Sequence, residues 1–201
     1  IPALACVTLT ACGGSSTGVS SFDTIKTKGQ QLIADYGTVK VTNVGSMPVS
    51  GLATYNGAAA YSTEYSDIVD ISEYATTVSD ISLSANFATS KITGVADNFH
   101  TRVSPNISLD GQLNLVGTIT GNPFNTDLNG TVTETVSGLT GDAAALNGLS
   151  LPVVYSGNRT GEFVGSNAGA LRGVGTGIGA TSYDGQALSI TVNAIFGGVT
   201  E

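Results

Sequence analysis

The sequence predicts an all-β fold, a single antiparallel up-and-down β-barrel of eight or nine strands. Apolar and polar side chains alternate from about residue 50 onward, which is the period of a strand with one buried face. The alternating segments are short and end at turns, and the chain has 27 glycines against 5 prolines. A closed barrel is the simplest arrangement that leaves no long sheet edge exposed.

The composition limits the class of protein. A chain of 201 residues with 41% hydrophobic and 11% charged residues can bury the core of one all-β domain. The net charge of −8 argues against nucleic acid as a partner, because phosphate binding needs basic patches. No apolar run reaches ~18 residues, so no spanning helix is expected. We expect a monomer.

The first 22 residues predict a processed and tethered N-terminus. Residues 1–12 have the character of a secretory signal peptide remnant, and the glycine- and serine-rich residues 13–22 predict a flexible tether. The run Leu-Thr-Ala-Cys at residues 9–12 resembles the lipobox of bacterial lipoproteins, which implies lipidation of Cys12 and removal of Cys6 with the signal. A buried free cysteine is the alternative, and the tether that follows favours the lipobox.

Residues 23–36 predict a short amphipathic helix ahead of the barrel domain, residues 37–201. Asp23 is placed to cap it, Ile25 and Leu32 share a face, and Gly37 ends it. We expect this helix to plug or flank one end of the sheet.

The strands follow from alternation and from turn residues. The clearest pair is the hairpin of residues 80–87 and 91–99, joined by a short polar turn. Asp142 is placed to cap one turn of helix within residues 138–150. The other predicted strands are 39–44, 52–61, 109–121, 124–135, 152–163, 171–180 and a final strand from residue 186 to 198.

Few residues are candidates for binding chemistry. The acidic segment Glu64–Asp80 fits either a calcium site or partner-facing loop, or a solvated connection, and its spacing matches no ordered ligand loop and favours the connection. His100 fits a metal or haem ligand less well than a solvent-facing loop histidine, because it is the one histidine of the chain. Arg172 either faces outward or pairs with Glu162. No convergent nucleophile and base are present, so no catalysis, metal or cofactor is predicted.

Residues 161–177 join two strands through a tight turn and carry the pattern G-x-F-x-G-x-x-A-x-x-L-x-G. Glycines at this density suit a sharply bent, closed sheet in which facing side chains need room. This run resembles one near the C-terminus of the barrel domains of bacterial transferrin-binding-protein-like surface lipoproteins, and the resemblance extends over roughly residues 47–198. It assigns a structural role to the motif residues Gly161, Phe163, Gly165, Ala168, Leu171 and Gly173.

The resemblance also implies a function. Outer-membrane anchoring through acylated Cys12, display on the cell surface and a non-enzymatic binding role are expected. In that role the barrel loops contact a host or environmental protein, or haem, as in iron or haem acquisition. No binding residue can be carried over from the family. A structural or adhesive surface barrel without a soluble ligand remains open as an alternative.

Overall fold

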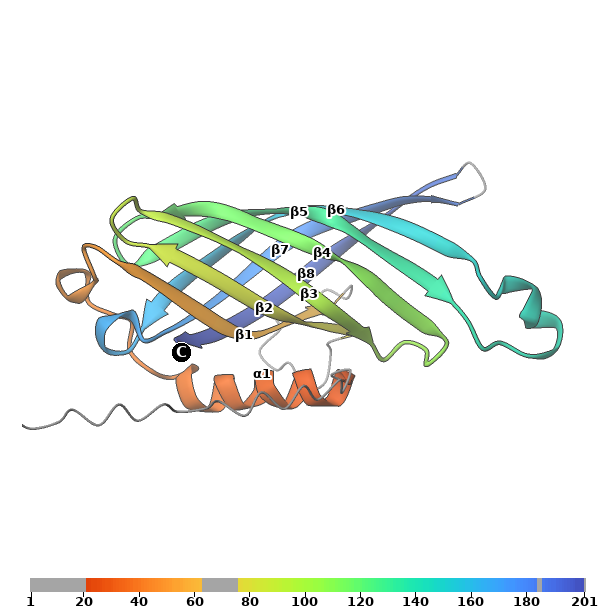
Figure 1. The fold of residues 1–201 in the computed structure, drawn as a ribbon, viewed down its shortest axis with the longest axis horizontal. Helices are drawn as coiled ribbons and strands as arrows, with labels where there is room; N and C mark the ends of the chain where they lie inside the picture. The colour runs from red at the N-terminus through yellow and green to blue at the C-terminus, as the bar shows by residue number, and fades with distance from the viewer. Residues whose placement is uncertain (1–20, 63–75, 184–185, 201) are drawn as a thin grey trace, which may run out of the picture.

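The computed structural model describes residues 21–62, 76–183 and 186–200. The chain forms a closed barrel of eight antiparallel strands, in which each strand pairs with the next and β8 pairs with β1 (Figure 1). This confirms the predicted fold class, with eight strands. The strands are β1 Leu52–Ser62, β2 Thr77–Asn86, β3 Lys91–Thr101, β4 Ile107–Ile119, β5 Pro123–Val136, β6 Ser150–Val164, β7 Ala170–Tyr183 and β8 Gln186–Thr200. The helical elements are α1 Phe22–Tyr36, η1 Val44–Ser46, η2 Gly141–Leu146 and η3 Ser166–Ala168.

An aromatic cluster fills the interior of the barrel. Phe163 of β6 is fully buried, and its ring centroid lies 5.2 Å from that of Phe124 and 5.6 Å from those of Tyr55 and Phe87. The rings of Tyr55, Phe124 and Phe163 occupy inward positions of β1, β5 and β6, as the period of two requires, and Phe87 directly follows β2. The tilted ring contacts are an arrangement that aromatic quadrupoles favour.

β7 presents glycine to the interior at four successive inward positions that follow Leu171. We call these residues the glycine stripe: Gly173, Gly175, Gly177 and Gly179. Side chains of the neighbouring strands lie over the stripe. A Cβ added at Gly173 would lie 2.3 Å from Cζ of Phe196, and one at Gly175 would lie 2.1 Å from Cδ of Arg159. The stripe therefore makes the room that the density of glycines predicts.

α1 lies along the outside of the barrel wall rather than at an end (Figure 1). Ile25 is buried against the outward-facing Ala58, Ala60 and Val78 of β1 and β2. The prediction of a plug was wrong because these small apolar residues on the outer face let a helix approach the sheet closely. Its N-cap is Ser21, whose Oγ accepts a hydrogen bond from the backbone N–H of residue 24, and not Asp23 as predicted.

Residues 37–50 connect α1 to β1 without forming the predicted strand at 39–44. Val41 makes an isolated bridge with Val164, and the backbone N–H of Thr42 donates to the carbonyl of Phe163 over 2.9 Å. The short helix η1 follows at once. The segment therefore crosses the end of the barrel at the turn between β6 and β7 instead of joining the sheet.

Candidate functional site

The two ends of the barrel differ in the length of their connections. At one end, the motif end, the strands are joined by the short turns at residues 87–90, 120–122 and 165–169, and residues 37–50 pack across it (Figure 1). At the other end, the loop end, the connections include residues 102–106 and the longer loop 137–149, which contains η2. Loops presented by a rigid scaffold are where binding residues concentrate, so the loop end is the candidate binding end.

The loop of residues 137–149 has its own internal order. The side chain of Asn147 donates to the carbonyl and accepts from the N–H of Leu139, both over 2.9 Å. η2 lies between them, as predicted, but its N-cap is Thr140, whose side chain makes no cap hydrogen bond, and not Asp142. The loop is thus a closed structure that exposes Leu146.

The motif residues lie together at the motif end. Gly161 pairs with Gly173 and Phe163 with Leu171 across β6 and β7. Gly165 adopts φ +78° at the start of the turn, which favours glycine, and Ala168 is fully buried with its carbonyl accepting a hydrogen bond from the Tyr55 hydroxyl at 2.7 Å. These contacts place the six residues in the wall and the turn, away from the loop end.

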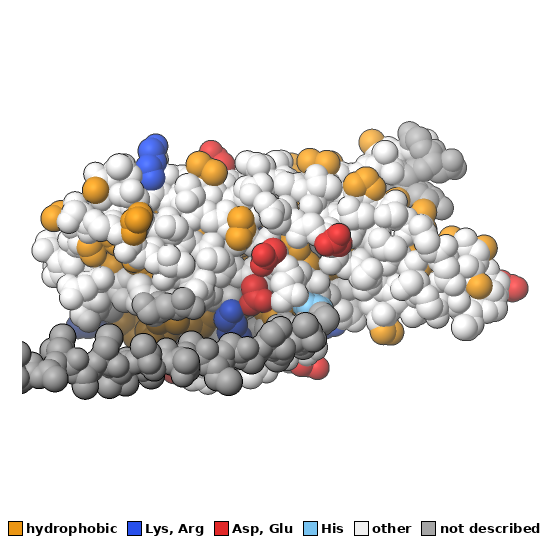
Figure 2. Space-filling model, viewed as in Figure 1, with side chains coloured by type: hydrophobic (Ala, Val, Ile, Leu, Met, Phe, Trp, Pro, Cys, Tyr) orange, Lys and Arg blue, Asp and Glu red, His pale blue; other side chains and the backbone are white. Residues whose placement is uncertain are grey.

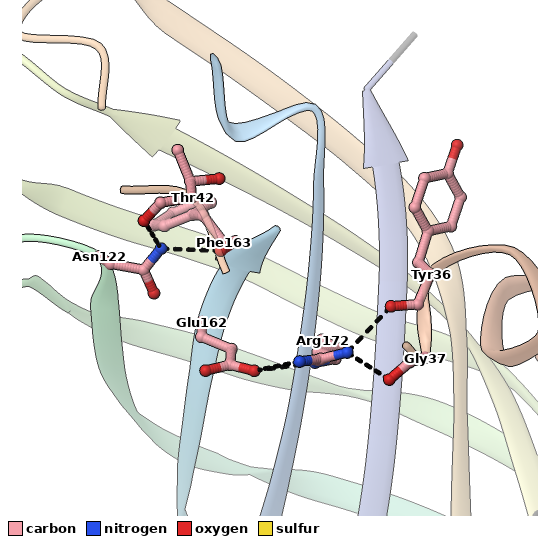
Figure 3. Close-up of polar contacts among 7 residues, drawn as sticks. All are labelled: Tyr36, Gly37, Thr42, Asn122, Glu162, Phe163 and Arg172. Atoms are coloured by element: carbon pink, nitrogen blue, oxygen red, sulfur yellow. Dashed lines mark hydrogen bonds and ion pairs between the residues drawn. The ribbon is translucent and has the colours of Figure 1, made fainter. Parts of the chain in front are cut away.

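The side chain of Asn122, which is not a motif residue, ties residues 37–50 to the barrel (Figure 3). Nδ2 of the buried Asn122 donates to the carbonyls of Thr42 and Phe163, each over 2.7 Å. Such long-range contacts of a turn asparagine were not foreseen from the sequence, because its partners are 41 and 80 residues away. Asn122 thereby closes the motif end.

Arg172 faces outward and also pairs with Glu162, so both possibilities left open by the sequence hold. Its Nε and Nη2 donate to Oε1 of Glu162 over 2.8 and 2.7 Å. Its Nη1 donates to the carbonyls of Tyr36 and Gly37 at the C-terminus of α1 (Figure 3). A cation at this end satisfies helix carbonyls that lack intrahelical partners. The pair borders a groove of about 550 Å³ between α1 and the wall.

The barrel lumen opens at the loop end into a second cavity, of about 200 Å³, which we call the luminal cavity. Its wall is mainly apolar, and its polar groups include Tyr61, Glu134, Tyr155 and Arg159. Arg159 is only 3% exposed, and its Nη1 donates to the carbonyls of Asn158 and Thr176 over 3.0 and 2.8 Å. A charged side chain inside the barrel was missed in the sequence analysis, although alternation backward from Phe163 places residue 159 inward.

Burial changes the proton affinity of the groups around the luminal cavity. Burial raises the pKa of Tyr155 to about 12, with the nearby Glu134 and Tyr61 adding to the shift. Burial also raises the pKa of Tyr61, against the opposing effects of its 3.1 Å hydrogen bond with Ser79 and of the Arg159 charge. Burial raises the pKa of the Glu134 carboxyl and lowers that of the Arg159 guanidinium. Burial thus favours the neutral form of each of these groups around the cavity.

The remaining predicted site residues lie apart from this cavity or outside the described ranges. Cys12 and residues 64–75 of the predicted acidic segment fall outside them. His100 lies on β3 rather than in a loop, is half-buried, and shares a 3.1 Å hydrogen bond with Asn98. Asp80 pairs with Lys28 of α1 at 2.8 Å. Within the described ranges, no group of three or more His, Cys, Asp or Glu residues could hold a metal ion, and no helix is long and apolar enough to cross a membrane.

An eight-stranded barrel with one sealed end and one looped end is a scaffold for presenting loops. The chain belongs to the family of the C-lobe and N-lobe beta barrels of Tf-binding protein B, whose sequence pattern it matches over residues 47–199. That range covers all eight strands except the last residue of β8, and it confirms the resemblance drawn from the motif residues.

Solved structures of transferrin-binding protein B are similar to the chain at low sequence identity. They include a point mutant from Haemophilus parasuis (20% identity, TM-score 0.39), intact Ap-TbpB (18%, 0.39) and the isotype 1 protein from serogroup B Neisseria meningitidis (17%, 0.38). Each similarity covers 80% of this chain and 28% of the other. Among curated proteins, none matches the sequence.

Proposed function

We propose that this chain is a non-enzymatic, lipid-anchored protein of the outer membrane that displays its barrel on the cell surface. Acyl chains on Cys12 hold it in the membrane, and the loops at the loop end capture a host or environmental ligand for iron or haem acquisition. A single acyl chain gives only marginal membrane binding, so several on one cysteine are needed for a stable anchor.

Membership of the family is the observation that carries this proposal. The family is described by the barrels of a transferrin-binding protein, and the match extends through all eight strands to the next-to-last residue of β8. Transferrin is therefore the first ligand to test. The difference between the two ends supports the choice of surface, because residues 37–50 and Asn122 occupy the motif end and leave the loop end for a partner.

The face of the outer wall in Figure 2 supports a role through the ends of the barrel rather than through this face. On the face in Figure 2, charged side chains are sparse and exposed hydrophobic ones are scattered among uncharged polar groups. Val116, Val154 and Val174 are exposed hydrophobic residues on three different strands. Scattered apolar residues are ordinary on a protein surface, whereas a binding face on the wall would gather them.

The test measures binding of iron-loaded human transferrin to the full chain carrying Cys12→Ser, by biolayer interferometry. A loop-end variant replaces the exposed Val103 and Leu146 with serine, and a matched control replaces the exposed Val49 and Leu52 beside the motif end. We expect the loop-end pair to weaken binding about tenfold or more, and the control pair to leave it unchanged. Equal weakening by both pairs would refute the choice of end.

Two further measurements separate the parts of the proposal. Haem is titrated into the same chain, and a Soret shift that is lost in His100→Ala would indicate that His100 on β3 binds haem. If neither transferrin nor haem binds, the role in iron or haem acquisition is wrong and a structural or adhesive barrel remains. Labelled palmitate should be incorporated in cells expressing the natural chain, and incorporation that persists in Cys12→Ser would remove the lipid anchor.

A further inference from the structure

The luminal cavity has the features of a small-molecule site that is separate from the loops. We propose that it binds a small monocarboxylate with an apolar body, whose carboxylate pairs with Arg159 inside the barrel. This site goes beyond capture of a protein by the loops, and it stands or falls independently of that function.

Arg159 is a buried cation whose charge is not compensated by the protein around it. In the described ranges the ion pairs are Lys28 with Asp80 and Arg172 with Glu162, and neither involves Arg159. Both of its hydrogen bonds there use Nη1, which leaves the Nε and Nη2 donors for another group. An unpaired buried charge is costly, and a guanidinium edge with free donors matches the two oxygens of a carboxylate.

The neighbouring strands are shaped to hold this guanidinium in place. The Arg159 side chain lies over Gly175, where a Cβ would come within 2.1 Å of Cδ and 2.9 Å of Nη1. On the other side, Thr126 of β5 pairs directly with Arg159 in the register of the sheet. The hydroxyl of Thr126 is buried and has no hydrogen-bond partner within the described part of the chain. Two polar groups with spare hydrogen-bonding capacity thus lie side by side in the lumen.

The size and lining of the luminal cavity define the rest of the ligand. A volume of about 200 Å³ corresponds to roughly seven molecules of liquid water, which limits a ligand to about that many non-hydrogen atoms. Most of the wall is aliphatic or aromatic, so the ligand body must be apolar. The wall residues include Phe99, Leu113, Leu128, Val132 and Val192.

Glu134 also lines the luminal cavity, but it lies too far along the barrel to share such a ligand with Arg159. Arg159 is in register with Thr126, and Glu134 follows Thr126 by eight positions on β5. At about 3.4 Å per residue this separation is roughly 27 Å along the strand, whereas the charges of an α-amino acid are only a few ångströms apart. The cavity therefore favours a monocarboxylate over a zwitterion, and its mainly apolar wall disfavours a second negative charge.

The test titrates hexanoate into the full chain carrying Cys12→Ser and measures heat by calorimetry, with hexanol, succinate and leucine as comparisons. We expect hexanoate to bind about tenfold or more tightly than hexanol, and succinate and leucine to bind more weakly. Arg159→Met should abolish hexanoate binding, and Arg172→Met on the outer face should preserve it. Tighter binding of leucine that is lost in Glu134→Gln would overturn the proposal in favour of an amino-acid site.

A second measurement keeps the proposal testable if Arg159→Met fails to fold. In the chain labelled with ¹⁵N-arginine, hexanoate should shift the side-chain Nε–H resonance of Arg159 and leave that of Arg172 in place. Thermal unfolding of Arg159→Met separates a binding role from a packing role. If Arg159 serves a ligand rather than packing, the melting temperature of Arg159→Met should equal or exceed that of the chain with Arg159, because methionine is apolar and of similar length. A lower melting temperature together with no hexanoate-induced shift would overturn the proposal.

Discussion

Gly173→Ala tests the claim that the glycine stripe is needed for packing. A Cβ at this position would lie 2.3 Å from Cζ of Phe196 and 2.5 Å from the carbonyl oxygen of Thr160, whereas non-bonded carbon atoms prefer about 3.5–4.0 Å. One contact is the far end of a buried ring and the other is backbone, so both the ring and the strand must move. The substitution adds a methyl group where the interior has no space for it.

The expected cost follows from two opposing effects. Overpacking a filled core costs about 1–3 kcal/mol, and the loss of unfolded-chain freedom from glycine to alanine returns about 0.4–1 kcal/mol. We expect a net loss of about 2 kcal/mol because a backbone atom is among the contacts. For a domain of this size, that corresponds to a fall in melting temperature of about 4–8 °C.

Urea and thermal unfolding followed by circular dichroism provide the measurement, since the chain has no tryptophan for fluorescence. The matched control is Val174→Ala, the next residue on the same strand, which faces outward and is 55% exposed. It should change the free energy of unfolding by less than about 0.5 kcal/mol. In a double-mutant cycle, Phe196→Leu should reduce the cost of Gly173→Ala by about 1 kcal/mol and leave the contact with Thr160. Equal melting temperatures for Gly173→Ala and Val174→Ala would refute the packing role.

Three further predictions concern polar groups. Arg172→Gln should destabilise the chain by about 1–2 kcal/mol and speed hydrogen exchange in α1, because it removes the donors to Tyr36 and Gly37; exchange that is unchanged would contradict this. The pKa of Tyr155 is about 12 in the folded state and 10.0 when unperturbed. The stability that its buried neutral form contributes is therefore complete below pH 10 and is lost as the pH rises to 12. Absorbance at 295 nm can follow the ionisation, with Tyr155→Phe as the control. Burial raises the pKa of Glu134 above the ordinary 4.5, so the folded chain loses stability as the pH rises through the folded pKa. Glu134→Gln should therefore raise the urea midpoint of unfolding at pH 7 and leave it unchanged at pH 3.

The barrel could be predicted from the sequence because its determinants are local. Alternation along one strand and the turn residues at its ends do not depend on distant partners, so strands such as β4 and β8 follow from the pattern. The prediction of a strand at residues 39–44 was wrong because Thr42 donates hydrogen bonds to the carbonyls of Phe163 and Gly165 at the motif turn. That competition between a sheet edge and a turn 120 residues away leaves no signal in the segment itself.

The position of α1 had a signal in the sequence of β1 that the prediction of a plug did not use. In the run Gly57–Ala60 small residues occupy both faces of β1. Ala59 does face the core, but Ala58 and Ala60 face outward and are buried beneath α1. A strand that stops alternating and becomes small and apolar on both faces indicates that something covers its outer side.

The candidate site is the part of the molecule that the sequence predicts least. The reason lies in β6, where alternation backward from Phe163 puts Gly161 and then Arg159 inside the barrel. A charge at a core position breaks the pattern, and such breaks are expected at functional sites because packing alone would select an apolar residue. Gly175 strengthens the case, since its missing side chain makes room for Arg159. An inward arginine and a facing glycine on adjacent strands form a combination that can be sought in other barrels of the family. If Arg159 serves only packing, Arg159→Met should bind hexanoate and other small carboxylates no more weakly than the chain with Arg159.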